Sequence, residues 1–157
     1  MPTAQIGVLM KSCFMFGHAD CPDTMLPRIE QAIEHYYSQY GITDYYIGNR
    51  GQFDGLAASA VQRVKQQHPD IRMYLVLAYH PGERPADLWG GFDGSFYPLL
   101  KRVPRPYAIV RVNQHMIDAS DFLICYVKHY GNTRNLLEYA MRRKKNGIHI
   151  KNVANDT

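Results

Sequence analysis

The sequence predicts an α/β domain in which helices cover both faces of a mostly parallel sheet, a three-layer sandwich. Short apolar segments typical of strands alternate along the chain with longer segments that have the periodicity of amphipathic helices. The links between them are short, which favours right-handed crossovers between parallel strands. The chain has 157 residues, of which 46% are hydrophobic. This is the size of one domain with one substantial core, so we expect a single domain over residues 1–157.

Two strand–helix units make up the first half of the chain. Residues 12–16 are short and apolar, as in a strand buried on both faces, and residues 26–40 then carry apolar side chains at helical spacing. The second unit joins a strand at 44–48 to a helix with an apolar face over 56–64, which ends before Pro69.

The second half continues the alternation after a break. A third strand is predicted at 73–79, and residues 80–106 are rich in Gly, Pro and aromatic residues, as in a lid or a binding wall. The remaining predictions are a short helix at 96–101, strands at 107–110, 122–127 and 148–150, and helices at 113–119 and 132–145. The chain thus offers about six strands in a Rossmann-like arrangement.

Ligands of such sheets bind beyond the carboxyl ends of the strands. The residues predicted there are mostly glycine or polar, and Phe53 and Tyr79 add aromatic rings that a loop position would leave free to contact a ligand. The candidate ligand-binding residues are Gly17 and His18 after the first strand, Gly48, Asn49, Arg50, Gly51 and Phe53 after the second, Tyr79 after the third, Arg111 and Asn113 after the fourth, and Gly131, Asn132, Thr133, Arg134 and Asn135 after the fifth.

Two of these clusters have a physical mechanism for binding phosphate. In residues 130–135, a glycine and a hydroxyl residue lie where a loop becomes a helix, so unpaired N–H groups and the helix dipole can hold an anion, with Arg134 adding a charge. The alternative is a helix cap worth about 1 kcal/mol. In residues 48–54, glycines flank a polar pair, as where backbone approaches a ligand closely. The alternative there is a plain tight turn with Asp54 in the first turn of the helix.

These segments also resemble a known group of proteins over nearly the whole chain. The resemblance rests on residues 16–18 (Phe-Gly-His), 48–57, 68–79, 113–124 and 131–135. Together they resemble the SLOG-type small bacterial proteins of the SMF/DprA-LOG superfamily. Members of that superfamily are Rossmann-like and include LOG enzymes, which release a base from a nucleoside monophosphate, DNA-processing proteins that bind single strands, and proposed sensors of nucleotide-derived signals. The resemblance implies a nucleotide-like ligand more strongly than any reaction.

The sequence departs from the LOG pattern, Pro-Gly-Gly-x-Gly-Thr-x-x-Glu, at the late helix. Residues 131–133 lack two of its glycines, and Leu136 replaces its glutamate. Glu138 is the nearest carboxylate, but it points about 200° away on a helix. If the protein hydrolyses an N-glycosidic bond, a carboxylate must stabilise the sugar cation and activate water. Asp54 is the best placed candidate and Glu138 the reserve, with Asp118 the third acid; each is also typical of a solvated helix residue.

The composition and residue spacing limit which metals, cofactors and binding partners we expect. The histidines show no close ligand spacing and the three cysteines are irregularly spaced, so we expect no metal site, and we expect no resident cofactor. Eighteen basic residues against fourteen acidic ones is a modest excess, and the cluster at 142–145 complements a helix dipole, which disfavours nucleic acid. No segment is typical of a membrane span or a signal peptide, so we expect a cytoplasmic protein. Self-association is compatible with such a domain.

Three functions therefore stay open. The leading hypothesis is a domain that binds or senses a nucleotide-derived small molecule or another phosphate-bearing ligand. The second is a nucleoside or nucleotide hydrolase that uses Asp54 or Glu138 in the same site. The third is a single-strand nucleic-acid binder, whose affinity would fall steeply with salt.

Overall fold

The computed structural model describes residues 9–79, 91–99, 104–143 and 149–155. Six strands form one sheet, every neighbouring pair is parallel, and the spatial order is β4–β3–β2–β1–β5–β6. This confirms the predicted fold class. The strands are β1 (Leu9–Gly17), β2 (Asp44–Ile47), β3 (Arg72–Val76), β4 (Gly94–Phe96), β5 (Ser120–Tyr126) and β6 (His149–Asn152).

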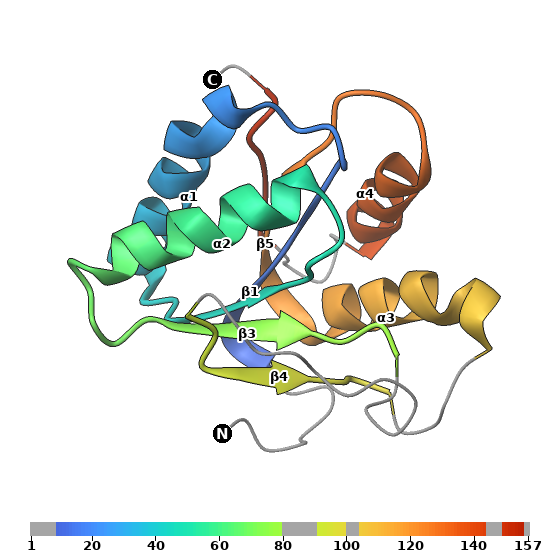
Figure 1. Cartoon of the computed structure of the whole chain (residues 1–157), viewed down its shortest axis with the longest axis horizontal. Helices are drawn as coiled ribbons and strands as arrows, with labels where there is room; N and C mark the ends of the chain where they lie inside the picture. Colours follow the sequence, from blue (N-terminus) through green and yellow to red (C-terminus); the bar gives the residue numbers. More distant parts are fainter. Residues whose placement is uncertain (1–8, 80–90, 100–103, 144–148, 156–157) are drawn as a thin grey trace.

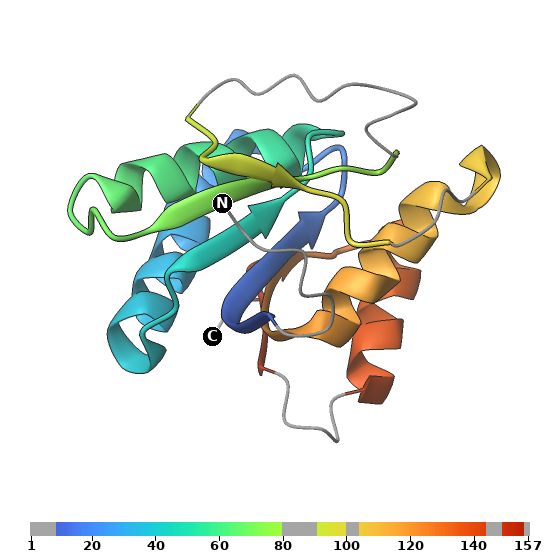
Figure 2. The ribbon, with the colours of Figure 1, turned by 90° about the horizontal axis from the view of Figure 1, so that it is seen from below.

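Helices cover both faces of the sheet (Figures 1 and 2). On one face lie α1 (Leu26–Tyr40), which follows a short 3₁₀ turn at Asp23–Met25, and α2 (Gln52–Lys65). On the other face lie α3 (Arg105–Ala119) and α4 (Asn132–Arg143). The predicted end of α1 is confirmed, since Gly41 takes a left-handed φ of 69° there.

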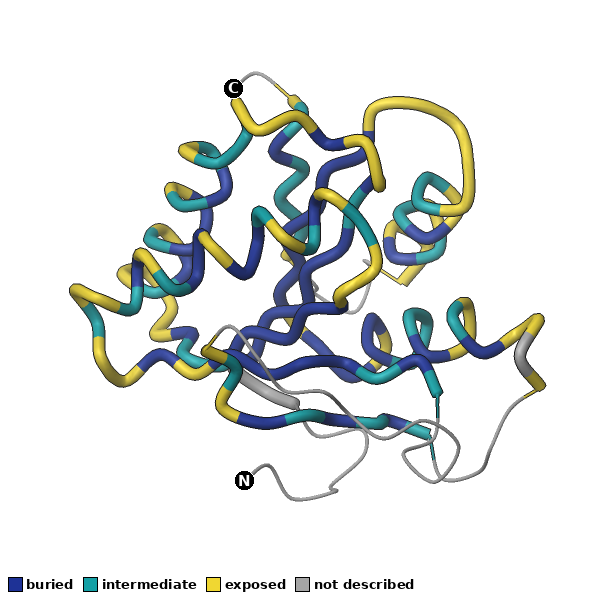
Figure 3. Tube along the Cα trace, viewed as in Figure 1, coloured by how far each residue is buried: buried dark blue, intermediate teal, exposed yellow. Residues whose placement is uncertain are grey.

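The core is split by the sheet into two layers, because successive side chains of a strand point to opposite faces. In β1, Cys13 and Met15 pack with α1 and α2, whereas Phe14 and Phe16 pack with α3 and α4. All four are buried, and Figure 3 shows the central strands as the most deeply buried part of the chain. This double burial explains why the strands read as apolar segments without alternation.

The segment between β3 and β5 differs from the prediction. The expected strand at 107–110 is wrong, because these residues belong to α3. Pro106 lies in the first turn of that helix, where proline is tolerated, and a stripe of Ala108, Val112 and Met116 is buried at helical spacing. Packing of this stripe on the sheet overrides the strand propensity of the Ile-Val pair in the sequence.

The short helix expected at 96–101 is also wrong where it is described, because Phe96 ends the edge strand β4, which the sequence analysis missed. Of the lid expected at 80–106, only residues 91–99 and 104–106 are described, and the rest lies outside the described residues. Lys144 and Lys145, at the end of the helix expected at 132–145, and the first residue of the strand expected at 148–150 also lie outside them. None of the helices in the described parts of the chain is long and apolar enough to span a membrane.

Candidate functional site

The chain leaves β1 toward β2 but leaves β5 toward β6, so the strand order reverses between β1 and β5. Such a switch point is where open parallel sheets bind ligands. A groove of about 500 Å³ lies there, bordered by the end of β1, the first turns of α2 and α4, and one face of α3. We call it the switch-point groove. Its lining includes nine of the candidate residues: Gly17, Gly48, Arg50, Gly51, Asp54, Asn113, Asn132, Thr133 and Asn135.

The first turn of α4 presents backbone donors to this groove. The first hydrogen bond of the helix runs from Asn135 N–H to Gly131 O, at 3.1 Å. The preceding N–H groups, of Asn132, Thr133 and Arg134, have no hydrogen-bond partner among the described residues. Gly131 has a φ of 141°, a conformation that favours glycine, and it brings the chain into the helix. The positive end of α4 is therefore open to an anion.

The first turn of α2 borders the same groove, but two of its backbone donors are used. Gln52 N–H donates to Ala19 O at 3.0 Å, and Phe53 N–H donates to His18 O at 3.4 Å. Gly51 permits this contact, because a Cβ there would lie 2.8 Å from Ala19 Cα. The loop at 48–54 thus uses its glycine for close approach of another loop, and a phosphate would meet fewer free N–H groups here than at α4.

Asp54 is the only carboxylate that lines the groove among the described residues. Its Oδ2 accepts the N–H of Arg50 at 3.1 Å, and the Arg50 guanidinium donates to Asn113 Oδ1 at 3.4 Å. Burial raises the pKa of Asp54, and the Arg50 N–H and charge oppose this rise only in part. Gly48 leaves room for the carboxyl, since a Cβ there would lie 2.9 Å from Oδ2. Asp54 therefore has the properties of a proton-transfer group.

His18 holds the loop that leads to α4. Its side chain is 4% exposed, and its Nε2 accepts the backbone N–H groups of Lys128 at 2.9 Å and His129 at 3.2 Å. Nε2 must then be unprotonated, so the neutral ring carries its proton on Nδ1. Burial lowers the pKa of His18, and the charge of His129 lowers it further. Because the His18 carbonyl also accepts from Phe53, this residue connects the starts of both helices.

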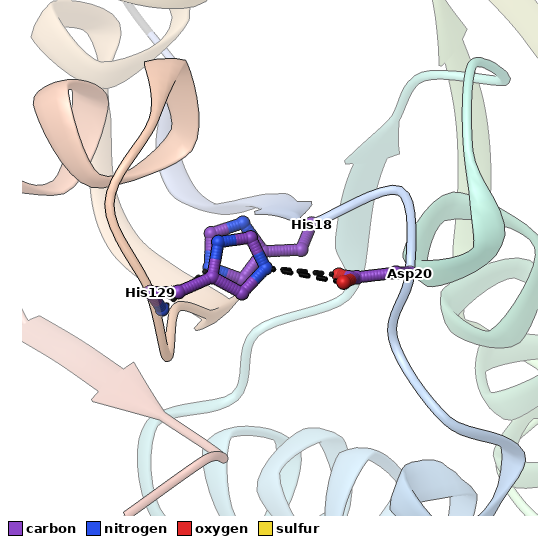
Figure 4. Close-up of side chains that lie close together, drawn as sticks. All are labelled: His18, Asp20 and His129. Atoms are coloured by element: carbon purple, nitrogen blue, oxygen red, sulfur yellow. Dashed lines mark hydrogen bonds and ion pairs between the residues drawn. The ribbon is translucent and has the colours of Figure 1, made fainter.

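His129 lies against His18 in a stacked pair (Figure 4). The ring centroids are 3.7 Å apart and the planes differ by 8°. His129 Nδ1 bonds Tyr130 O at 3.0 Å and Nε2 bonds Asp20 at 3.1 Å. These two bonds raise the pKa of His129, and the His129 hydrogen bond lowers the pKa of Asp20. The stack therefore joins a neutral ring to one that favours its charged form.

His18, Asp20 and His129 also bring three groups that can bind metals within 4.8 Å of one another. The arrangement does not fit a shared ion. An imidazole binds a metal in its own ring plane at about 2.0–2.1 Å, and two parallel rings 3.7 Å apart cannot both direct an in-plane lone pair at one ion. The Nε2 lone pair of His18 is moreover taken by two backbone N–H groups.

Several candidate residues lie outside the lining of the groove. Phe53 was expected to be free in a loop, and this is wrong, because it lies in α2 with no exposed surface and packs beside Gly17. Arg111 is exposed on α3 and not at the end of a strand. The others outside the lining are His18, Asn49, Tyr79, Gly131, Arg134 and Glu138.

The other two acids that the sequence offered, Glu138 and Asp118, are placed differently from Asp54. Asp118 pairs with Arg143 at 3.1 Å and accepts from the Tyr139 hydroxyl at 2.8 Å, so it has a structural explanation. Glu138 is exposed. The lining also holds Tyr139 and Arg142, one face of α4 that the sequence analysis did not assign to the site. Tyr139 lies four residues after Asn135 and Arg142 lies seven after it, and this helical spacing is the signal that could have found them.

Comparison with known proteins adds no identification: no family model matches the chain, and no curated protein matches it.

Proposed function

We propose that this protein binds a small phosphate-bearing ligand of nucleotide type in the switch-point groove. The observation that carries the proposal is the set of unpaired N–H groups at the start of α4, at Asn132, Thr133 and Arg134. Backbone donors at the positive end of a helix are a general means of binding phosphate. A plain helix start also leaves its first N–H groups without intrahelical partners, but it does not explain why Asn132 and Thr133 line a groove at the switch point of the sheet.

The remaining walls suit the rest of such a ligand. A volume of about 500 Å³ is within the usual range for small-molecule sites. Ile109, Val110 and Leu136 supply apolar surface, while Arg50 and Arg142 supply positive charge. Apolar surface beside a few polar groups is typical of sites that orient a ligand with a flat organic part and an anionic part.

The second candidate function is hydrolysis of the N-glycosidic bond of that ligand. It is favoured by one observation, the carboxyl of Asp54, which lines the groove and has a pKa raised by burial. A carboxyl with a raised pKa that lines a groove can act as a general acid or base toward a bound ligand. Binding and hydrolysis differ only in whether a base is released.

The test is a thermal-shift screen of the purified protein against AMP, ADP, ATP, NAD, ADP-ribose and cyclic AMP, with each mixture then analysed by mass spectrometry. A ligand at a hundred times its Kd stabilises the native state by about 2.7 kcal/mol. The proposal is contradicted if none of these compounds raises the melting temperature. A shift with released base that is lost in Asp54→Asn supports the hydrolase, and a shift without release supports binding alone.

Two variants locate the ligand. Asn132→Pro removes one unpaired N–H at the first helical position, where proline is tolerated, and Thr133→Val removes the hydroxyl. Each should weaken binding about tenfold, as expected for loss of one hydrogen bond to a charged group. Thr24→Val is the matched control, because Thr24 is an exposed threonine in the turn before α1 and does not line the groove. Equal affinities in all three variants would place the ligand elsewhere.

A further inference from the structure

The switch-point groove continues along α4, well beyond the first turn of that helix. After Asn132 and Thr133, its lining includes Leu136, Tyr139 and Arg142, which recur at helical spacing on one face of α4. Because an α-helix rises about 1.5 Å per residue, Asn132 and Arg142 are about 15 Å apart along the helix axis. The groove therefore offers contacts far from the open N–H groups of the first turn.

Arg142 is the cation at the far end of this helix face. Its side chain is exposed, and its guanidinium carbon lies 5.9 Å from the centre of the Tyr139 ring. No carboxylate of the described residues forms an ion pair with Arg142. Asp54, the carboxylate in the groove lining, accepts the N–H of Arg50 instead. The charge of Arg142 is thus available to an anion in the groove.

The ring beside Arg142 is held in place by α3. The Tyr139 hydroxyl donates to the carboxylate of Asp118 at 2.8 Å, and the ring is half-buried. Asp118 lies in the last turn of α3, which runs beside α4 on the same face of the sheet (Figures 1 and 2). A cation that rests on an ordered ring loses less conformational freedom when it binds an anion.

The dipole of α4 alone does not explain Arg142. Arg142 and Arg143 both lie in the last turn of the helix, where any cation complements the dipole. Arg143 pairs with Asp118 at 3.1 Å and lies outside the groove lining. Arg142 lines the groove and has no such pair in the described chain. The dipole accounts for two cations in this turn but not for the position of one of them at the groove.

We propose that Arg142 forms a second anion subsite in the switch-point groove, so that the preferred ligand is a nucleotide with two separated anionic groups. This inference rests on the function proposed above, because it describes another part of the same ligand. One phosphate binds at the start of α4, and the guanidinium of Arg142 binds the second. Between them, the nucleoside lies against the apolar wall that Ile109 and Leu136 supply. Nucleoside 3′,5′-bisphosphates belong to this chemical class.

The test compares adenosine 3′,5′-bisphosphate with AMP and ADP in ¹⁵N–¹H NMR titrations of the full chain. ADP also carries two phosphates, but they are joined directly, so it controls for the number of phosphates. We expect the Kd of the bisphosphate to be about tenfold lower than that of AMP, and lower than that of ADP. The bisphosphate should shift backbone signals of residues 132–134 and 139–143, whereas AMP should shift those of 132–134 alone.

Variants of the two neighbouring arginines locate the second subsite. Arg142→Met removes the charge and should abolish the tenfold preference for the bisphosphate over AMP, whereas Arg142→Lys keeps the charge and should retain part of it. Arg143→Met is the matched control, because it removes the adjacent cation of the same turn and lies outside the groove lining. It should keep the full preference. The dispersion of each spectrum reports whether the variant is folded.

The possible failures of this test are distinguishable. If neither AMP nor the bisphosphate binds, the function proposed above is contradicted and the second subsite with it. If AMP binds at the start of α4 but the bisphosphate binds no more tightly, the second subsite alone is overturned. Equal affinities for ADP and the bisphosphate would overturn it too, since they would indicate general attraction of charge. So would an equal loss of preference in Arg142→Met and Arg143→Met.

Discussion

The first turns of α2 and α4 border the same groove and both follow a glycine, yet they differ in what their backbone donors do. At α2, N–H groups of Gln52 and Phe53 are bonded to the carbonyls of Ala19 and His18. At α4, the corresponding N–H groups have no partner in the described chain. The glycine before α2 therefore accompanies donors used for packing of the protein on itself, whereas the glycine before α4 accompanies donors that stay open, as the proposed phosphate site requires.

The largest effects are expected when a methyl group is added at each glycine, which tests the difference between the two helix starts directly. Gly51→Ala places a Cβ 2.8 Å from Ala19 Cα, whereas a Cβ at Gly131 meets nothing within 4 Å. We expect Gly51→Ala to lower the free energy of unfolding by about 2–3 kcal/mol, as overpacking does. Gly131→Ala should cost about 1 kcal/mol, because only its positive φ is strained.

Urea unfolding measures both values, and ligand affinity supplies the other half of the test. We expect Gly131→Ala to reduce phosphate binding more than Gly51→Ala, in the reverse order of the stability losses. If Gly51→Ala is tolerated while Gly131→Ala unfolds the protein, the assignment of packing to α2 and ligand binding to α4 is wrong.

The second prediction concerns pH, because the loop before α4 is held by His18 and His129. The pKa of His129 is raised, so the stability it contributes is full below about pH 6.5 and is lost as pH rises through its folded-state pKa. The pKa of His18 is lowered, so its contribution is full above about pH 6.5 and is lost progressively as pH falls below that value. The two histidines together should give maximum stability near pH 6.5.

Urea unfolding from pH 5 to pH 9, with an NMR titration of the histidine rings, measures this dependence. Asp20→Asn should lower the pKa of His129 and flatten the fall in stability on the alkaline side. Asp23→Asn is the control, because Asp23 is an exposed acid of the same loop that bonds Gln52 and no histidine. An unchanged pKa of His129 in Asp20→Asn would mean that the ion pair does not form in solution.

Sequence periodicity was sufficient to predict the elements whose pattern of burial is regular along their whole length. The strands from β1 to β3 are buried on both faces and α1 and α2 each bury one face, so apolar spacing identified them. It failed at 107–110, where β-branched residues suggested a strand but a buried stripe over Ala108, Val112 and Met116 made a helix. Strand β4 was missed because three residues carry too little pattern.

The candidate site was predictable where it depends on the fold class and not where it depends on pairing between distant loops. Placing ligand residues at strand ends brought seven of them, at or after the ends of β1, β2 and β5, to one groove, since parallel strands end on the same side of a sheet. Asn113 reaches the groove from α3, so the strand end predicted for it is wrong. Sequence could not indicate that the donors of α2 are bonded to residues more than thirty positions earlier. Nor could it pair His18 with His129, which are 111 residues apart.

The smallest expected effect on stability belongs to Asp54, which lies in the first turn of α2 and lines the switch-point groove. Its raised folded-state pKa means that the folded protein binds this proton more tightly than the unfolded chain does, so stability falls as pH rises through that pKa. Asp54→Asn keeps an oxygen for the Arg50 N–H and removes the charge of this half-buried group. We expect the free energy of unfolding of this variant at neutral pH to equal that of the unmodified protein or to exceed it by up to about 1 kcal/mol. A clear loss of stability in urea would show instead that the carboxylate is held by Arg50 as a favourable ion pair, and its position at the groove would then be explained by structure alone.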